Sequence, residues 1–320
     1  MTQTDSTYAF VFTGVYDCAN SANRISRAID TFLGYSACRV SVSSGHPFGY
    51  SEDECSLDEA IGHLSRAESP VVFTCGCSAG DYLRLRSIMN NLKVTVGVFH
   101  IGTEFRKSSS TLTIKDRKYR AKLRFISPDS MHLSKGFGNL YQHAIEPSVN
   151  QSPALDDARP IRIAHSPSKR STKGTGAIIK AINSIPAQYE DLFEFKIIEG
   201  LSYEECSRVR AESDIFICQM NPAIGGFGYS AVEACASGMA VISSRNNAPD
   251  SLWLREGLDA PPVIGADSME QLTSTLVELI TNREKLRHHK KRSLQWVTSG
   301  SASLHKAGKY YVEHIEKALE

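Results

Sequence analysis

Residues 224–244 read IGGFGYSAVEACASGMAVISS, and this stretch decides the fold expected for the rest of the chain. Three glycines within four positions predict a loop whose backbone can take positive φ angles and approach a ligand closely. Ser230 is positioned to cap a short helix, with Glu233 completing a capping box, and Gly238 to end it. The apolar run that follows predicts a buried strand. A glycine loop that leads into a helix N-terminus suits a phosphate or sugar hydroxyls.

A family resemblance goes further than the local pattern, which on its own also fits a plain capped helix in any α/β domain. The stretch resembles the donor-site signature of nucleotide-sugar glycosyltransferases of the GT-B fold, in the large retaining family 4. That signature reads Glu-Gly-Phe-Gly, four residues, Glu-Ala, a small residue or two, and Gly. Gly226-Phe227-Gly228, Glu233-Ala234 and Gly238 match in order and spacing. Gly225 stands where the family has its first Glu, so either the sugar is recognised differently or transfer is impaired.

The resemblance also implies roles within this stretch. Backbone N–H groups of residues 226–230 would approach the sugar or the phosphates of the donor. Glu233 would accept hydrogen bonds from the ribose hydroxyls, a role that suits an acceptor-only carboxylate. The donor-binding residues implied here are Gly225, Gly226, Phe227, Gly228, Tyr229, Ser230 and Glu233.

Length and composition describe an ordinary globular protein. The 320 residues are enough for two domains, and 41% hydrophobic and 22% charged residues are typical values. A formal net charge of +1 argues against nucleic-acid binding by bulk charge. The eight cysteines are scattered without a CxxC pair, which favours free thiols in a reducing cytoplasm over a zinc site. We find no signal peptide and no run of about 18 apolar residues, so we expect a cytoplasmic protein without a transmembrane segment.

In the first half, strands alternate with helices, which predicts a doubly wound parallel sheet. Strands are expected at 8–15, 39–43, 70–75 and 93–100, and helices at 22–33, 57–67 and 79–90. Ligands bind beyond the carboxyl ends of such strands, which singles out Gly14 with Tyr16, and His100 with Thr103 and Glu104.

His100 is open to two interpretations. A lone histidine at a strand end is more often a packed structural residue. Residues 98–106 resemble the family segment in which a histidine or an acid faces the reacting sugar, so the resemblance implies a catalytic role for His100. It also places Gly14 on the donor side, and Tyr16, Thr103 and Glu104 on the acceptor side.

Residues 113–124 carry six Lys and Arg residues against one acid, Asp116. The plain interpretation is a solvated helix face. Anionic lipid headgroups, in a peripheral membrane contact, or a polyanion such as DNA are the functional alternatives. Residues 125–128 resemble a short strand that leads into a helix, 141–147 the last strand of the first domain, and 148–159 have the composition of a linker.

The second half begins with an expected strand at 160–165, a loop with three cations at 166–176, and a helix at 177–185. Cations at a helix N-terminus oppose the helix dipole, so their clustering predicts an anion such as a diphosphate between them, although a solvated basic loop is the alternative. Lys173-Gly174 matches the family's Lys-Gly. The family arginine falls near Ser168, so Arg170 or Lys169 would supply that charge. Glu199, after a strand at 195–199, is a weak candidate for contact with the nucleotide base.

The remaining expected elements are consistent with a GT-B fold. They are a helix at 204–211, a strand at 214–219, and helices at 268–281, 284–298 and 302–319. The resemblance implies two Rossmann-like doubly wound parallel-sheet domains that face a cleft, with a C-terminal helix crossing back. Residues 1–150 with 302–320 would form the acceptor domain, and 159–300 the donor-binding domain.

The function implied is a retaining hexosyltransferase that moves a sugar from a nucleotide-sugar, UDP-linked first of all, to a hydroxyl acceptor. A lipid-linked or cell-surface saccharide is the first acceptor expected. Lys173 and Arg170 would neutralise the leaving diphosphate, so neither a cofactor nor a metal is expected. The alternatives are a transferase for a hydroxymethylated base in DNA, a nucleotide-sugar-binding relative that is catalytically impaired, and a GT-B epimerase.

Overall fold

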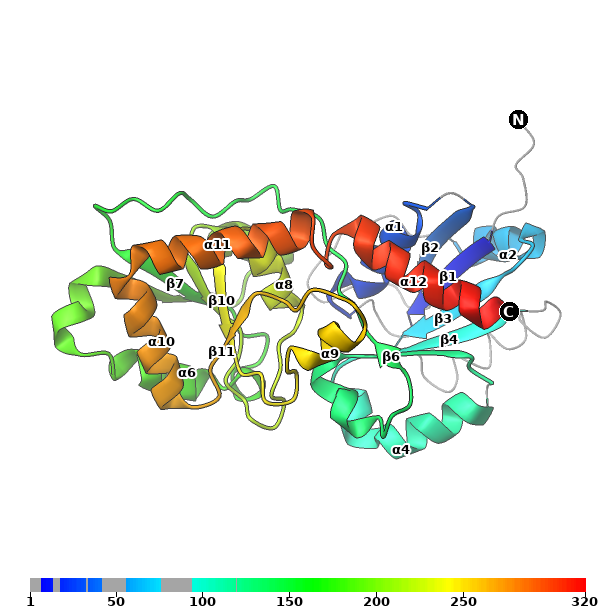
Figure 1. Cartoon of the computed structure of the whole chain (residues 1–320), viewed down its shortest axis with the longest axis horizontal. Helices are drawn as coiled ribbons and strands as arrows, with labels where there is room; N and C mark the ends of the chain where they lie inside the picture. The colour runs from blue at the N-terminus through cyan, green and yellow to red at the C-terminus, as the bar shows by residue number, and fades with distance from the viewer. Residues whose placement is uncertain (1–6, 14–17, 33, 42–55, 76–93, 119) are drawn as a thin grey trace. The chain divides into compact units, whose positions relative to one another are not determined.

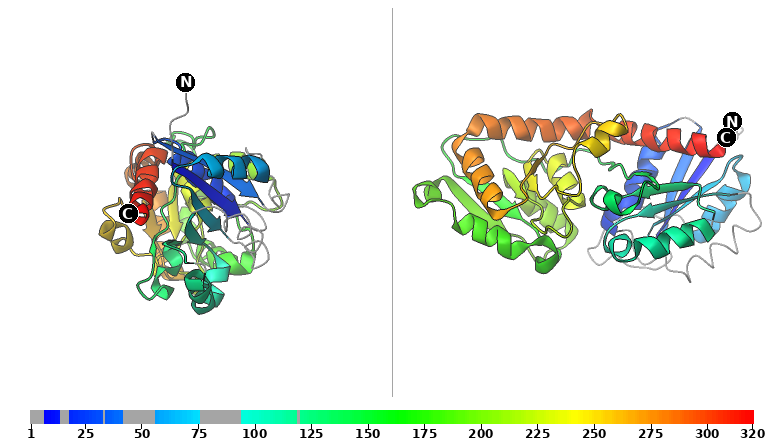
Figure 2. Two further views of the ribbon diagram at one scale, coloured as in Figure 1. Left: turned by 90° about the vertical axis from the view of Figure 1, so that its right-hand side faces the viewer. Right: turned by 60° about the horizontal axis from the view of Figure 1, so that its bottom comes forward.

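The computed structural model describes residues 7–13, 18–32, 34–41, 56–75, 94–118 and 120–320. The chain divides into two compact units, the first of residues 1–144 with 302–320 and the second of residues 145–301. Each unit is built on one parallel sheet with helices packed against it (Figures 1 and 2). The prediction of two parallel-sheet α/β domains with a C-terminal helix is confirmed. No helix in the described ranges is long and apolar enough to cross a membrane.

The first unit holds a six-stranded parallel sheet in the order β2-β1-β3-β4-β5-β6. The terminal helix α12 belongs to this unit and packs along α1 (Figure 1). The elements are β1 (Thr7–Thr13), α1 (Ser21–Ile29), β2 (Tyr35–Ser41), α2 (Leu57–Arg66), β3 (Val71–Cys75), β4 (Thr95–His100), α4 (Thr103–Lys118), β5 (Leu123–Ile126), β6 (Asn139–Leu140) and α12 (Leu304–Leu319), with 3₁₀ turns at Cys18–Asn20 and Pro128–Leu133. The helix expected at 79–90 lies outside the described residues.

Aromatic rings form much of the core of the first unit. Phe99 stacks on Phe73 and Phe125, with ring centroids 4.9 and 5.3 Å apart. Tyr311 of α12 meets Phe125 edge-on at 4.9 Å, and its hydroxyl donates to the Gln142 carbonyl at 2.5 Å. The terminal helix is therefore held to β5 by ring packing and to the segment that follows β6 by a buried hydrogen bond.

The second unit holds a five-stranded parallel sheet in the order β11-β10-β9-β7-β8. Helices α6 and α10 cover one face, and α8 and α11 pack together against β10. The elements are β7 (Ile161–His165), α5 (Arg170–Lys173), α6 (Thr175–Asn183), β8 (Phe193–Ile197), α7 (Tyr203–Ala211), β9 (Ile215–Ile217), α8 (Tyr229–Ala236), β10 (Ala240–Ser243), α9 (Ser251–Arg255), β11 (Val263–Gly265), α10 (Met269–Thr281) and α11 (Arg283–Thr298), with a 3₁₀ turn at Ala187–Leu192.

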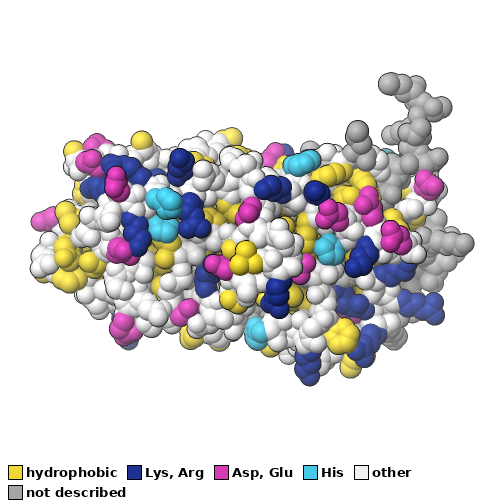
Figure 3. All heavy atoms as spheres, viewed as in Figure 1, with side chains coloured by type: hydrophobic (Ala, Val, Ile, Leu, Met, Phe, Trp, Pro, Cys, Tyr) yellow, Lys and Arg dark blue, Asp and Glu magenta, His cyan; other side chains and the backbone are white. Residues whose placement is uncertain are grey.

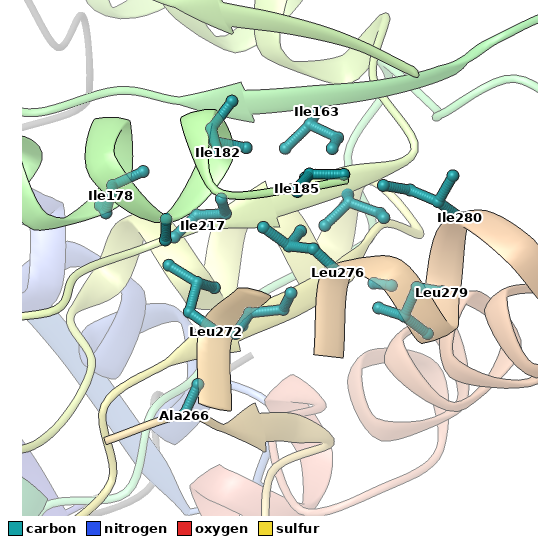
Figure 4. Close-up of a cluster of buried hydrophobic side chains, with 14 of the residues drawn as sticks. Ile163, Ile178, Ile182, Ile185, Ile217, Ala266, Leu272, Leu276, Leu279 and Ile280 are labelled. Atoms are coloured by element: carbon teal, nitrogen blue, oxygen red, sulfur yellow. The ribbon is translucent and has the colours of Figure 1, made fainter. Parts of the chain in front are cut away.

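An aliphatic cluster forms the core on the α6 and α10 face of this sheet (Figure 4). Its side chains come from helices with apolar residues three and four apart and from the strands between them. Buried isoleucine and leucine side chains interdigitate there, and each contributes about 1.5–3 kcal/mol by leaving water. The labelled members are Ile163, Ile178, Ile182, Ile185, Ile217, Ala266, Leu272, Leu276, Leu279 and Ile280.

Three expectations in the middle of the chain are wrong. Residues 141–147 form no strand, because Tyr141 packs edge-on against Phe99 and strand pairing with β5 stops at Leu140. The basic run 113–124 is no single helix face, because α4 ends at Lys118 and the chain turns into β5. Residues 148–159 are no free linker, because the Ser148 and Ser152 N–H groups donate to the Ala236 and Ser237 carbonyls of the second unit.

Candidate functional site

The strand order of the second unit locates a binding crevice. The chain leaves β7 for β8 on one side and reaches β9 on the other, so the topological switch point lies between the ends of β7 and β9. Ligands of doubly wound sheets bind in the crevice outside these carboxyl ends. The segments that follow the two strands are 166–174 and 218–228, which hold the cations and glycines that the sequence singles out.

Lys173 ends the short helix α5, which forms part of the segment predicted as a loop, and α5 is fastened to the segment that follows β9. The Met220 N–H donates to the Lys173 carbonyl at 3.0 Å, and the Asn221 side-chain amide donates to the Thr172 carbonyl at 3.0 Å. Gly174 has φ +68°, and a Cβ on it would lie 2.8 Å from the Met220 carbonyl carbon. Glycine is required there both by the backbone conformation and by the close approach of two backbones. The position of Lys173 is therefore set by main-chain contacts.

Three groups of the site gather where α8 begins. Lys173 Nζ lies 3.9 Å from Cys218 Sγ, and the Cys218 thiol is 3.6 Å from Ser230 Oγ. A Cβ on Gly228, the N-cap of α8, would be 3.8 Å from Lys173 Nζ. A half-buried ammonium thus stands beside the N-terminal end of a helix, and both favour an anion. Ser230 makes no capping hydrogen bond, so the predicted capping box is wrong and the cap is the Gly228 backbone.

Gly226 and Phe227 support the loop from within. The Gly226 carbonyl accepts hydrogen bonds from the Gln219 amide and from Ser243 Oγ, the latter at 2.9 Å. The buried Phe227 ring stacks on Trp253, with centroids 5.8 Å apart. Tyr229 is also buried. Of the residues predicted for the glycine loop, Gly228 and Ser230 are half-buried at the start of α8. The others are buried beneath the loop surface.

Gly225 is held in a conformation that opposes any side chain. Its φ is +57°, and a Cβ would lie 2.7 Å from Asn247 Nδ2 and 3.0 Å from the Asn247 backbone nitrogen. Asn247 in turn donates from its N–H to the Gly225 carbonyl at 2.7 Å and from its amide to the Ile224 carbonyl at 3.0 Å. Asn247 thus occupies the space that a glutamate at this position would need.

We therefore expect Gly225→Glu to destabilise the second unit and not to restore a family-like site. The left-handed backbone alone costs about 1–2 kcal/mol for a residue with a Cβ, and the overlap with Asn247 adds to it. The measurement is urea unfolding followed by tryptophan fluorescence, since both tryptophans, Trp253 and Trp296, lie in this unit. Gly176→Glu is the matched control, because a Cβ on Gly176 meets nothing within 4 Å. Equal stability of the two variants would contradict the expectation.

Glu233 is engaged by a cation that the sequence did not reveal. Its carboxylate is 3.1 Å from Arg210 Nη2, and both side chains are buried. Arg210 lies in the last turn of α7 with its guanidinium over the Phe216 ring at 5.5 Å. The pair holds α7 to α8, so the carboxylate has a structural partner that neither the predicted capping box nor the predicted ribose contact included.

The remaining cations of the loop are exposed. Arg170 Nε lies 2.9 and 3.1 Å from the Glu199 carboxylate oxygens, and Nη2 2.6 Å from the second of them. This hydrogen bonding lowers the pKa of Glu199 and keeps it ionised. Ser168 and Lys169 are exposed beside it. The structure therefore brings Arg170 and Glu199 together beyond the ends of β7 and β8, a pairing that is not evident from the sequence.

His165, which was not among the predicted site residues, fixes the end of β7 in this site. Its fully buried ring has Nδ1 2.8 Å from the Ile217 carbonyl of β9 and Nε2 2.9 Å from Thr175 Oγ1 at the start of α6. A carbonyl only accepts, so Nδ1 carries the proton and Nε2 accepts from the Thr175 hydroxyl. Burial, with a smaller contribution from the nearby charge of Lys173, lowers the pKa of His165 to about 4.

This pKa predicts an acid-sensitive step in stability. Above pH 6.5 the ring is neutral in both the folded and the unfolded chain, and its full contribution to the free energy of unfolding is present. As the pH falls from about 6.5 to about 4, the unfolded chain binds the proton first, and about 3 kcal/mol of stability is lost. Urea unfolding of wild type and His165→Gln across this range should show a weaker pH slope in the variant. The control, His288→Gln at an exposed position, should keep the wild-type slope; equal slopes in wild type and His165→Gln would contradict the assignment.

In the first unit, His100 is buried at the end of β4 and contacts an acid. Its Nε2 lies 2.7 Å from Asp116 Oδ2 of α4, and its ring stacks on Phe105 with centroids 4.6 Å apart. Arg124 Nε approaches the same carboxylate oxygen at 3.4 Å. Thr103 and Glu104 are the first two residues of α4, and Gly14 and Tyr16 lie outside the described residues. His100 thus has the structural partners that the plain interpretation predicts, and its catalytic role stays a prediction.

No protein-family description and no curated protein matches the chain by sequence. Solved structures match its fold. A glycosyltransferase from Rickettsia africae covers 99% of both chains with a TM-score of 0.62 at 11% identity. The HepE protein of Anabaena, in complex with UDP-glucose, covers 97% of this chain and 99% of its own with a TM-score of 0.61 at 10% identity. A UDP-N-acetylglucosamine 2-epimerase covers 97% and 95% with a TM-score of 0.51 at 11% identity. The likeness shows that the fold is GT-B.

Proposed function

We propose that this chain is a glycosyltransferase that takes a UDP-linked sugar as its donor and binds the diphosphate in the second unit. The observation that carries the proposal is the Lys173 ammonium beside Gly228 and the start of α8, at the switch point of the sheet. A cation and a helix N-terminus together complement a diphosphate. The complex of the similarly folded HepE protein with UDP-glucose supports UDP as the nucleotide.

Lys173 would stabilise the negative charge that develops on the leaving diphosphate as the bond from the sugar to the phosphate oxygen breaks. Arg170 could join it by exchanging Glu199 for a phosphate, since the pair is exposed. With these cations the reaction is proposed to need no metal. Transfer with retained anomeric configuration follows from the resemblance of residues 226–238 to retaining family 4. We assign the hydroxyl acceptor, a saccharide that is lipid-linked or on the cell surface, to the first unit.

A panel of UDP-sugars tests the proposal, with chelator present and with saccharide acceptors added in turn. We expect one donor to release UDP, faster with an acceptor, and to give a product with the anomeric configuration of the donor. Folded protein that neither binds nor turns over any nucleotide-sugar would contradict the proposal. A product with the opposite anomeric configuration would still establish a glycosyltransferase, but it would contradict the retaining mechanism.

An epimerase is the second candidate, because the fold is also similar to that of a UDP-N-acetylglucosamine 2-epimerase. An epimerase needs no acceptor, so proton NMR of the nucleotide-sugar with enzyme alone separates the two. Conversion to a stereoisomer without acceptor would establish the epimerase. Unchanged nucleotide-sugar under those conditions, with UDP release once an acceptor is present, supports the transferase.

A further inference from the structure

The charges of residues 105–138 in the first unit are strongly one-sided. This segment holds nine Lys and Arg residues and two acids, Asp116 and Asp129. Both acids are buried and paired, Asp116 with His100 and Arg124, and Asp129 with Arg106. Neither acid of this segment therefore pairs with one of its exposed cations.

Two large apolar side chains are exposed among these cations. Ile114 of α4 is 66% exposed and Phe137 is 46% exposed. Arg117 is one helical turn from Ile114, and its guanidinium lies over the Phe137 ring at 5.2 Å. This contact joins the end of α4 to the loop at 134–138. Figure 3 shows hydrophobic side chains flanked by Lys and Arg over the region labelled α4 in Figure 1.

We infer that this region, the α4 surface, docks on a membrane that carries anionic lipids. The α4 surface consists of Ile114, Arg117, Arg120, Lys135 and Phe137, all of them exposed. Its cations are attracted to anionic headgroups, and its two apolar side chains gain by entering the interfacial region. A DNA backbone would interact favourably with the cations but would not bury the apolar side chains. The exposed Ile114 and Phe137 therefore favour a lipid surface.

The inference does not depend on the transfer reaction, since it rests on residues outside the proposed donor site. The experiment is cosedimentation of the full chain with vesicles of phosphatidylcholine, alone or mixed with phosphatidylglycerol, at low and high salt. We expect binding to the mixed vesicles only, weakened by salt because the attraction is electrostatic.

Two double variants separate the contributions. Arg117→Gln with Lys135→Gln should weaken partitioning about 25-fold, from about fivefold for each cation. Ile114→Ser with Phe137→Ser should weaken it about tenfold or more while the remaining binding stays salt-sensitive. All four side chains are exposed, so losing the Arg117–Phe137 contact should lower the melting temperature only slightly and to a similar extent in both variants.

Matched controls sit on the second unit. Lys291→Gln with Arg292→Gln removes the same charge from exposed positions of α11, and Leu254→Ser removes an exposed apolar side chain. Both should bind vesicles like wild type. The inference is overturned if wild type ignores anionic vesicles, or if the controls lose as much binding as the α4 variants. It is also overturned if the apolar variant binds vesicles normally and the charge variant loses salt-sensitive binding to duplex DNA instead.

Discussion

Replacing Asp214 with asparagine is expected to lower the free energy of unfolding of the second unit by about 3–5 kcal/mol. Its carboxylate is fully buried and lies 2.7 and 2.9 Å from the Arg159 guanidinium and 3.0 Å from Lys290 Nζ. The Arg162 N–H donates to it as well, at 3.0 Å. Without this charge, Arg159 and Lys290 would stay largely buried and lose the carboxylate that compensates them. The segment 148–159 would then lose its anchor.

The same carboxylate predicts how stability depends on pH. Burial raises its pKa, but the hydrogen bond from Arg159, the charge and hydrogen bond of Lys290, and the hydrogen bond from the Arg162 N–H together outweigh this and hold the pKa of Asp214 below 3.8. Its contribution is therefore complete above about pH 4 and is lost as the pH falls through the lowered pKa. The difference in stability between wild type and Asp214→Asn should shrink accordingly at low pH.

Urea unfolding followed by tryptophan fluorescence is the measurement, because Trp253 and Trp296 report on this unit alone. Asp157→Asn is the matched control. Its carboxylate is 73% exposed and pairs with Arg287 at 2.7 Å, so the change should cost less than about 1 kcal/mol. A loss of similar size in the two variants would mean that Asp214 does not anchor the segment.

Lys173→Ala is expected to lower kcat/KM for the UDP-sugar about 100- to 1,000-fold, the usual effect of removing one group that stabilises charge in the transition state. The reason is the position of its ammonium beside Gly228 and the start of α8. The loop itself should keep its shape, because main-chain bonds and Gly174 fix it.

Steady-state release of UDP measures the effect, with Lys180→Ala as the control. Lys180 is exposed in the last turn of α6, and its removal should leave kcat/KM unchanged. Lys169→Ala tests whether Lys169, which is exposed beside Arg170, supplies the second charge predicted for the diphosphate. Normal turnover by Lys173→Ala would remove this residue from the site, and the same loss in Lys180→Ala would point to a general effect of charge.

The fold of the second unit was predictable from the sequence, because its helices and strands carry clear periodicities and turn residues. Strand β7 and helices α10 and α11 lie within one or two residues of their expected ranges. The strand expected at 141–147 rested on the family resemblance, and the sequence YQHAIEP does not show that strand pairing ends at Leu140 while the Tyr141 ring enters an aromatic core. The composition of residues 148–159 suggested a linker. It could not show that Arg159 and Ser152 attach this segment to residues that are distant in the sequence, Asp214 and Ser213.

The candidate site was predictable where backbone chemistry defines it. Lys173-Gly174 and the glycines of 225–228 stand out in the sequence, and the structure brings Lys173 to Gly228. His165, Arg210 and Asn247 were missed, because their roles come from partners 10 to 52 residues away that only the folded chain brings close. A buried histidine at a strand end next to a basic loop is the one signal that could have been read for His165.

The most direct test of the account is equilibrium binding of UDP to the full chain by calorimetry, with chelator present. We expect one UDP bound per chain, with weaker binding by Lys173→Ala and unchanged binding by Lys180→Ala. Absence of UDP binding by wild-type protein that unfolds cooperatively, or binding that is indifferent to Lys173, would contradict a diphosphate site at the switch point of the second unit.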